Sequence, residues 1–363
     1  MRPRSNARYS LLFEAAIMKK IIKFILVIAL PFGLYIAGLL IWGTVTDYEP
    51  EALITLEHQG EGTAVPDSIF TFVTWNIGFT GLGEETDFFY DGGKTVIQTE
   101  ELVQKNREGI TAFIEANKEI DFFLFQEVDS AAKRSHGVNQ MKTIHQKLAD
   151  YQWSFAKNYD VDFVPMPLTE PMGGVVSGLA TFTQLPSFNH ERHGFDSQFS
   201  WPTSIFFLDR CFLSERVKLS NEKELVVINT HCSAYDTAGT MVANEIKKIM
   251  QFAEKEYLKG NYVVIGGDWN QCPPNYTPID TTGAYNEFVL SNDQLPEGFR
   301  WVADASTPTN RKLTTVYNEN SYTSVIDHFV LSPNLSVEAI SVVDLAFQFS
   351  DHQPVKLAVK LIN

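Results

Sequence analysis

The sequence contains only three cysteines, Cys211, Cys232 and Cys272, and no two of them form a C-x-x-C pair. This scarcity excludes a small domain held together by disulfides and argues against a cysteine zinc site. We expect three buried free thiols, with oxidation of one pair as the alternative. Repeats and low-complexity runs are also absent. At 44% hydrophobic and 20% charged residues, the chain is typical of a globular protein and not of a disordered one.

Basic residues are few, since 29 Lys and Arg stand against 44 Asp and Glu for a formal net charge of −15. No Lys/Arg-rich run follows residue 23. A protein that grips nucleic acid mainly through its phosphates needs a basic face, so the composition argues against that class. It leaves open a site that holds one phosphate through a metal ion.

The N-terminal region has the features of a membrane anchor. Residues 1–23 contain six basic residues and one acidic residue, and residues 24–43 then form an uncharged stretch of 20 residues. A helix of about 20 apolar residues can cross a bilayer. Lysines precede the stretch and acids follow it, so the positive-inside rule predicts a single-pass transmembrane helix at 24–43. Residues 1–23 are then cytoplasmic, and everything after Thr44 lies on the non-cytoplasmic side.

Two other interpretations of this stretch stay open, a cleaved signal peptide and a buried core helix. A signal peptide normally has a shorter apolar region of about 7–15 residues, followed by a small-residue cleavage site. The segment from Trp42 to Asp47 offers no such site. Met18, which two lysines follow, provides a second candidate start, and residues 1–17 would then be an upstream extension.

Beyond the anchor, residues 44–66 resemble a polar linker and residues 67–363 a single large domain. Helical periodicity is found at 99–119, where Thr99 can cap the N-terminus, and again at 141–148 and 246–257. The remaining apolar runs are short and β-rich, which predicts an α+β domain with sheets packed on sheets and helices outside. The predicted strands are 69–75, 120–125, 176–182, 225–228, 262–265, 325–331 and 355–361.

Most of these strands carry a carboxylate, carboxamide or imidazole at one end, where a scaffold commonly positions a site. Singly, each such residue has an ordinary structural explanation, such as a turn-forming Asn or a hydrogen-bonded His. Together they supply oxygen ligands, two histidines and no cysteine cluster, which suits Mg²⁺ or Mn²⁺ better than zinc. The candidate residues are Asn76, Glu127, His231, Asp268, Asn270, Asp327, Asp351 and His352.

Short motifs at these positions make the chain resemble the endonuclease/exonuclease/phosphatase superfamily, metal-dependent phosphoesterases with a deoxyribonuclease-I-like fold. The resemblance runs from about Ile69 to Leu361 and implies a four-layer α/β/β/α sandwich, in which helices flank two central sheets. The motifs are Thr74-Trp-Asn76-Ile, Gln126-Glu127-Val, Ser177-Gly-Leu-Ala-Thr-Phe, Asn229-Thr-His231, Gly267-Asp268-Trp-Asn270, Ile326-Asp327-His328-Phe and Ser350-Asp351-His352-Gln-Pro-Val.

The resemblance also implies a metal site. Glu127 would be the principal metal carboxylate, and Asn76 and Asp351 would complete the shell directly or through water. A phosphate ester repels anionic nucleophiles, so a divalent cation at this site would neutralise the charge that develops during the reaction. We therefore expect Mg²⁺ or Mn²⁺ as the cofactor.

The remaining candidates receive catalytic roles from the same resemblance. Asp268 would orient or deprotonate the attacking water. Asn270 and His231 would donate hydrogen bonds to the phosphate oxygens. His352 would act as acid/base or stabilise the transition state, with Asp327 accepting the other ring proton and fixing the tautomer.

The sequence disfavours two subgroups of this superfamily but leaves several substrate classes open. Asn270 is followed by Gln-Cys-Pro-Pro-Asn275 and not by the Asn-Tyr-Arg-like stretch of the inositol-polyphosphate 5-phosphatases, and the basic insertions of the abasic-site endonucleases are missing. Loops 79–91 and 155–175 are rich in aromatic residues and prolines, and we expect them to rim the site. A phospholipid, a small phosphodiester and a nucleic acid remain as substrates, and a catalytically silent binding module remains as the other class. We predict membrane association and no protein partner.

Overall fold

The structure, a computed structural model, describes residues 5–57, 62–66, 68–196, 199–234, 239–274, 276 and 289–362. Residues 1–4 of the predicted basic segment, residue 67 at the predicted domain start and Asn275 lie outside the described residues. The chain divides into two compact units, Met1–Asp47 and Tyr48–Asn363.

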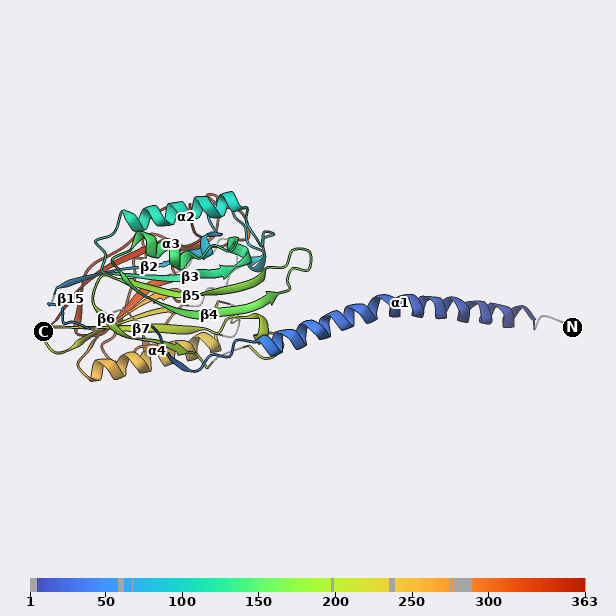
Figure 1. Ribbon diagram of the computed structural model, residues 1–363, viewed down its shortest axis with the longest axis horizontal. Helices are drawn as coiled ribbons and strands as arrows, with labels where there is room; N and C mark the ends of the chain where they lie inside the picture. Colours follow the sequence, from blue (N-terminus) through green and yellow to red (C-terminus); the bar gives the residue numbers. More distant parts are fainter. Residues whose placement is uncertain are drawn as a thin grey trace. The chain divides into compact units, whose positions relative to one another are not determined.

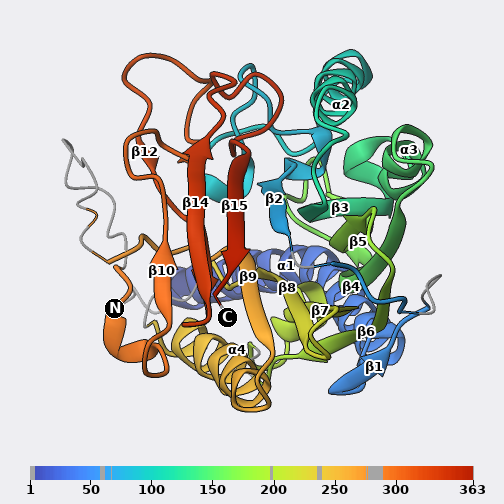
Figure 2. The ribbon, with the colours of Figure 1, turned by 90° about the vertical axis from the view of Figure 1, so that its left-hand side faces the viewer.

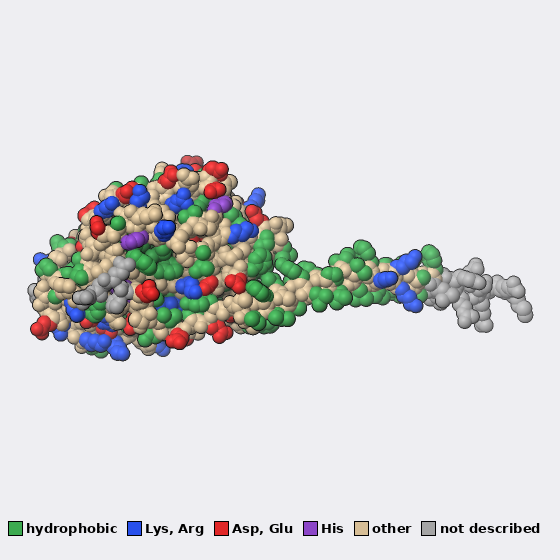
Figure 3. All heavy atoms as spheres, viewed as in Figure 1, with side chains coloured by type: hydrophobic (Ala, Val, Ile, Leu, Met, Phe, Trp, Pro, Cys, Tyr) green, Lys and Arg blue, Asp and Glu red, His purple; other side chains and the backbone are tan. Residues whose placement is uncertain are grey.

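The first unit is the single long helix α1 (Ser5–Thr46), which contains the predicted span and extends beyond both of its ends (Figure 1). The part from Phe13 to Thr46 is long and apolar enough to cross a membrane. Figure 3 shows hydrophobic side chains along most of its length and basic side chains near its N-terminal end. Pro31 lies inside the helix, as membrane-spanning helices tolerate.

The second unit is built on two β-sheets packed face to face (Figure 2). Among the described residues, one sheet has seven strands in the spatial order β1 (Leu53–Thr55), β6 (Ser187–Gly194), β7 (Cys211–Lys218), β8 (Glu224–His231), β9 (Tyr262–Asp268), β13 (Asp327–Leu331) and β10 (Arg300–Val302). The other has six, in the order β14 (Leu335–Val342), β15 (Val355–Leu361), β2 (Ile69–Asn76), β3 (Phe122–Ala132), β5 (Gly173–Thr183) and β4 (Gln152–Val164). Strands β11 (Asn310–Arg311) and β12 (Thr323–Ser324) form a small separate ladder.

Helices cover the outer face of each sheet, which confirms the four-layer α/β/β/α sandwich (Figure 1). Helices α2 (Glu100–Glu115) and α3 (Gln140–Lys147) pack on the six-stranded sheet. Helix α4 (Thr240–Leu258) packs on the seven-stranded sheet. Thr99 caps α2 as predicted, because its side chain accepts a hydrogen bond from the backbone N–H of Leu102.

Side chains alternate between the two faces of a strand, and both faces of the central strands are buried, one against the other sheet and one against the helices. The central strands are therefore apolar on both faces. In β2, Phe70 and Phe72 point into the core between the sheets, whereas Val73 and Trp75 point towards α2 and α3. All three cysteines are buried and free, as expected.

Two stretches that were predicted as a linker and a loop contain strands. The predicted linker 44–66 is partly folded into the second unit, which begins at Tyr48, and Leu53–Thr55 within it form the edge strand β1 paired with β6. Such a short strand is stabilised by its partner and leaves no periodic pattern of its own. The stretch 155–175, predicted as a loop, lies largely in the hairpin strands β4 and β5, and only residues 165–172 connect them.

Candidate active site

Strand register brings the candidate residues together at one edge of the two sheets. Strands β2 and β3 run parallel, with Asn76 opposite Gln126. Strands β8 and β9 run parallel in the other sheet, with His231 opposite Asp268. Strand β13 runs antiparallel to β9 and starts at Asp327, directly opposite Asp268. Because parallel strands end at the same edge, the polar residues that follow the apolar runs converge there.

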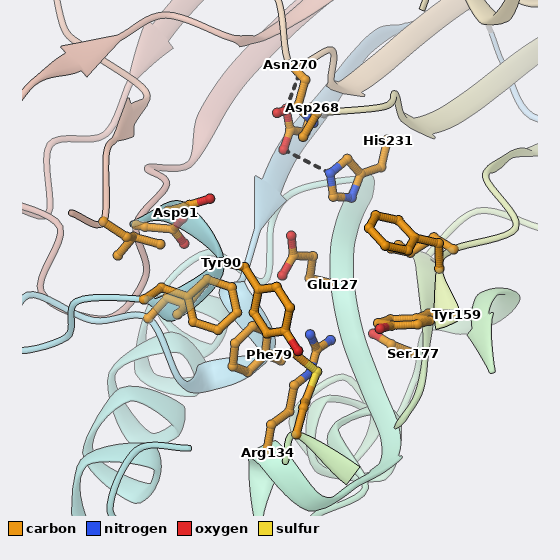
Figure 4. A pocket seen from close by; sticks show the side chains of 18 of the residues that line it. Phe79, Tyr90, Asp91, Glu127, Arg134, Tyr159, Ser177, His231, Asp268 and Asn270 are labelled. Atoms are coloured by element: carbon orange, nitrogen blue, oxygen red, sulfur yellow. Dashed lines mark hydrogen bonds and ion pairs between the residues drawn. The ribbon is translucent and has the colours of Figure 1, made fainter. Parts of the chain in front are cut away.

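A β-bulge directs Glu127 into the site. The pairing of β3 with β5 shifts between Phe125 and Val128, and Glu127 within the shift has a left-handed φ of 54°. This conformation costs a non-glycine residue roughly 1–2 kcal/mol, and bulges commonly re-aim a side chain beside an active site. Figure 4 shows the Glu127 carboxylate pointing into open space between Asp268 and Arg134.

A pair of buried carboxamides joins the two sheets beneath the site. Gln126 Nε2 donates to Asn229 Oδ1 at 2.7 Å. Asn229 Nδ2 in turn donates to the backbone carbonyls of Phe125 and Ala180, each at 3.1 Å. These bonds fix the position of β8 relative to β3, and therefore of His231 relative to Glu127.

The Asn76 carboxamide connects the acidic groups of the two sheets. Its Nδ2 lies 3.2 Å from Glu127 Oε1 and 3.0 Å from Asp268 Oδ2, and it donates to both. Its Oδ1 accepts from the backbone N–H of Gly78 at 3.0 Å, which fixes the orientation of the amide.

Asp268 is the centre of the polar cluster. Its Oδ2 lies 3.3 Å from His231 Nε2 and 3.6 Å from His352 Nε2, and its Oδ1 accepts from the backbone N–H of Asn270 at 2.9 Å. Burial opposes a charged carboxylate, but the two imidazoles and the hydrogen-bond donors outweigh it and hold the pKa of Asp268 below its usual range. The carboxylate is therefore ionised at neutral pH.

The two histidines differ in charge. Burial and the nearby Arg210 guanidinium hold the pKa of His231 well below its usual value, so this ring is neutral. Burial also opposes a charged His352, but neighbouring carboxylates outweigh it and raise the pKa of His352 well above its usual value. The first of these carboxylates is Asp327, whose Oδ2 lies 2.8 Å from His352 Nδ1. Asn310, which the sequence analysis did not identify, lies with its Nδ2 3.0 Å from His352 Nε2.

The acidic groups around Asp351 fit a divalent cation. Burial raises the pKa of Asp351 to about 7, with the negative charge of Glu127 adding to the rise and His352 and Arg311 opposing it. A cation between such carboxylates would relieve this repulsion. Gly78 makes room for the Asp351 carboxylate, because a residue with a Cβ at this position would place it only 2.8 Å from Asp351 Oδ1. Glu127 and Asp351 therefore offer oxygen ligands suited to Mg²⁺ or Mn²⁺, whereas Asn76 presents its Nδ2 to Glu127 and would have to turn its amide to offer an oxygen.

A second trio of ligand-type atoms, from Asp268, Asp327 and His352, lies within 4.8 Å of one another. Asp327 and His352 are already hydrogen-bonded to each other, so their arrangement suits a proton-holding pair better than a metal site. All eight residues predicted from the sequence thus lie in one connected cluster, in which each is within hydrogen-bond or ion-pair distance of another member.

A cavity of about 720 Å³ opens over this cluster. Its polar end is formed by Glu127, His231, Asp268, Asn270, Asp351 and His352. The walls beyond are mainly apolar and aromatic, with Phe79 and Tyr90 on one side and Tyr159 on the other (Figure 4).

Three arginines line the cavity, and the sequence analysis identified none of them as part of the site. The guanidinium of Arg134 pairs with Asp129 at 2.9 Å and lies 3.8 Å from the centre of the Phe79 ring. Arg210 contacts the His231 carbonyl, and Arg311 is held by the carbonyls of residues 82, 83 and 86. Isolated arginines give no periodic or motif signal, so only the fold reveals their position.

The sequence model of the endonuclease/exonuclease/phosphatase family matches residues 73–352, which is most of the chain and includes every candidate residue. The chain belongs to this family. The family is named for enzymes that hydrolyse phosphate esters, which places the chain among the hydrolases of ester bonds. No curated protein sequence matches it.

Solved structures of low sequence identity share the fold. An endonuclease/exonuclease/phosphatase from Beutenbergia cavernae DSM 12333 aligns with a TM-score of 0.55 at 18% identity, over 81% of this chain and 72% of that one. D. rerio TDP2 complexed with single strand DNA product gives 0.52 at 14% identity, over 81% and 100% of the two chains. ANGEL2, a 2′,3′-cyclic phosphatase in complex with adenosine-2′,3′-vanadate, gives 0.54 at 15% identity, over 85% and 99%.

Proposed function

We propose that the protein is a divalent-metal-dependent phosphoesterase that hydrolyses a phosphodiester or phosphomonoester. The observation that carries this proposal is the connected cluster around Asp268. It combines an ionised carboxylate, a charged histidine held by a second carboxylate, and a donor set suited to a hard cation. A structural role alone does not require these groups to face a cavity.

In the proposed reaction, Asp268 orients and deprotonates the attacking water. Its pKa is held low by the two imidazoles and by hydrogen bonds, so it stays anionic and available as an acceptor. Glu127, Asn76 and Asp351 would hold Mg²⁺ or Mn²⁺, which would supply positive charge to offset the charge developing on the phosphate.

His352 donates a proton or a charged hydrogen bond to the phosphate or the leaving oxygen, and Asp327 holds the ring with its Nδ1 proton in place. The neutral His231 and the amide of Asn270 donate to the non-bridging oxygens. Asn270 Nδ2 now donates to the Cys232 carbonyl at 2.9 Å, and it would turn from that carbonyl to reach a substrate.

The test is hydrolysis of bis-p-nitrophenyl phosphate by the full-length protein with Mg²⁺ or Mn²⁺, with EDTA and with His352→Ala. We expect metal-dependent release of p-nitrophenol that EDTA and His352→Ala both abolish. A matched control is His145→Ala on α3, a histidine that does not line the cavity, which should keep full activity. Equal rates under all conditions would support the catalytically silent binding module instead.

A nuclease is the alternative substrate assignment, supported by the fold shared with D. rerio TDP2 complexed with single strand DNA product. A panel of phospholipid vesicles, plasmid and single-stranded DNA under the same conditions separates the two. Release of oligonucleotides at rates above those for phospholipid would select the nuclease.

We also propose that α1 anchors the protein in a membrane as a single-pass helix, with Lys19, Lys20 and Lys23 on the cytoplasmic side and the unit Tyr48–Asn363 on the other. The exposed apolar surface of α1 and the charge asymmetry at its ends support this topology. Protease added to spheroplasts should digest the second unit, and full protection would reverse the orientation. The mass of the isolated native protein separates an anchor from a cleaved signal peptide.

A further inference from the structure

The walls of the cavity, away from the catalytic cluster, are mainly apolar, although Arg134, Arg210 and Arg311 also line it. Three segments supply them, 79–90, 164–172 and 202–208, through side chains that include Phe79, Phe88, Val164, Met172, Phe206 and Leu208. These side chains pack together as one cluster around the cavity. A site for a wholly polar phosphate ester gains nothing from such walls, whereas an ester with an apolar portion buries that portion against them.

Exposed large apolar side chains lie on two loops that contribute other residues to the cavity wall. Met166 and Leu168, in the loop between β4 and β5, are 45% and 58% exposed, and Trp201, in the loop between β6 and β7, is 59% exposed. The two loops meet at the cavity, which both Met166 and Pro202 line. Tyr159 Oη donates to the Phe206 carbonyl at 3.2 Å and links β4 to the second loop. We call Met166, Leu168 and Trp201 the apolar rim.

A buried arginine places the start of the catalytic unit beside the elements that carry this rim. Arg192 is 1% exposed. Its Nε donates to the Lys157 carbonyl in β4 at 2.8 Å, and its Nη2 donates to the Asp209 carbonyl in the β6–β7 loop at 2.8 Å. Its Nη1 lies 3.5 Å from the Glu51 carbonyl, where the chain enters the unit. The Lys157 ammonium also lies over the Tyr48 ring, with its Nζ 3.9 Å from the ring centre.

The short connection between α1 and Glu51 limits the distance between a bilayer that holds α1 and the point where the chain enters the second unit. Helix α1 ends at Thr46, and five residue steps lead from there to Glu51. A fully extended chain of that length spans at most about 18 Å. With α1 as the proposed anchor, the segment fixed by Arg192 stays within this chain length of the bilayer. Arg192 also contacts β4, which leads into the β4–β5 loop, and the β6–β7 loop.

We propose that the substrate is a lipid phosphoester presented by the bilayer, and that the apolar rim inserts into the membrane surface at the mouth of the cavity. This inference rests on the proposed function. The cavity is of the size that encloses a drug-sized molecule, so it takes the phosphate and the adjoining part of the chains while the rest stays in the bilayer. Water oxygen forms the new bond to phosphorus, the P–O bond to one alcohol breaks, and that alcohol leaves with a proton.

The test compares two substrates that differ only in an alkyl chain, ethyl p-nitrophenyl phosphate and hexadecyl p-nitrophenyl phosphate. The full-length protein is reconstituted into phosphatidylcholine vesicles with Mg²⁺, and the hexadecyl ester is added to the same vesicles. We expect kcat/KM for the hexadecyl ester to exceed that for the ethyl ester by at least about tenfold, since each buried methylene adds to binding.

Leu168→Ser and Trp201→Ser should each lower the hexadecyl-to-ethyl ratio several-fold, and together by about tenfold or more. Leu258→Ser is the matched control, because Leu258 is 77% exposed at the end of α4 and outside the apolar rim. Its ratio should equal that of the unaltered protein.

The outcomes separate this inference from the proposed function. Hydrolysis of both esters at equal efficiency, with ratios unaffected by the rim variants, would overturn the lipid inference and leave the phosphoesterase standing. Faster hydrolysis of single-stranded DNA than of the hexadecyl ester would also overturn it. Hydrolysis of no ester at all would overturn both.

Discussion

Glu215 gives the sharpest prediction about stability, because it is a carboxyl group buried in the core between the two sheets. It lies on β7, is 1% exposed, and stands opposite Val227 of β8. Its Oε2 accepts from the Ser154 hydroxyl at 3.1 Å, and its Oε1 has no hydrogen-bond partner among the residues that the structure describes. Burial raises the pKa of Glu215 to about 8, and the Ser154 hydroxyl only partly opposes the rise.

The pKa difference between the folded and unfolded states sets the direction in which the free energy of unfolding changes with pH. The folded pKa lies above the ordinary value of 4.5, so the folded state prefers the protonated form. The contribution of Glu215 to stability is therefore fully present below pH 4.5 and is lost as the pH rises through about 8. One pKa unit corresponds to about 1.4 kcal/mol, so this group lowers the free energy of unfolding by about 2 kcal/mol between pH 6 and pH 8.

The assay is urea unfolding of the full-length protein in one detergent at both pH values, for the unaltered chain and for Glu215→Gln. The amide is close in shape and does not ionise, so the variant should gain about 2 kcal/mol relative to the unaltered protein on going from pH 6 to pH 8. Glu297→Gln, at an exposed position, controls for the loss of one charge. A Glu215→Gln effect that is the same at both pH values would refute the reasoning.

Three further predictions concern the site and the Gln126–Asn229 hydrogen bonds that connect the two sheets. Asp327→Asn should lower kcat on bis-p-nitrophenyl phosphate by about 10²–10⁴-fold, because His352 loses the carboxylate that holds its proton, and an unchanged kcat would contradict the proposed pair. Glu127→Gln should raise the Mg²⁺ concentration for half-maximal activity by about tenfold or more, measured by metal titration, and an unshifted titration would move the metal site elsewhere. Asn229→Ala should lower the free energy of unfolding by about 1–3 kcal/mol in urea, since it leaves Gln126 and two backbone carbonyls without their partner, and exposed Asn318→Ala serves as its control.

The candidate residues could be picked from the sequence because of where strands place the residues at their ends. Asn76, His231 and Asp268 each end a buried apolar run, and parallel pairing carries such ends to one edge. Each sheet has one such parallel pair, so residues that follow apolar runs in the sequence lie together in space. The short apolar runs and the separated helical stretches predicted sheets packed on sheets with helices outside, and the family resemblance supplied the four-layer arrangement.

Features that depend on distant partners could not be predicted. Strand β1 is three residues long and exists because β6 pairs with it. The position of Arg134 follows from its contacts with the Phe79 ring and Asp129, which the sequence does not connect. The bulge at Glu127 replaces a regular ladder with a left-handed residue, and no glycine marks it.

The place of β15 in its sheet has a consequence for the time at which activity appears. This strand is the last one among the described residues, yet it lies between β14 and β2, and the His352 carbonyl just before it accepts from Trp75 Nε1 at 2.9 Å. The residues of the site thus span the domain from Asn76 to His352, and its last members are synthesised some 275 residues after its first. A partly synthesised chain holds Asn76 and Glu127 without Asp351 and His352, so the proposed activity must wait until residues 351–361 have emerged and β15 has paired.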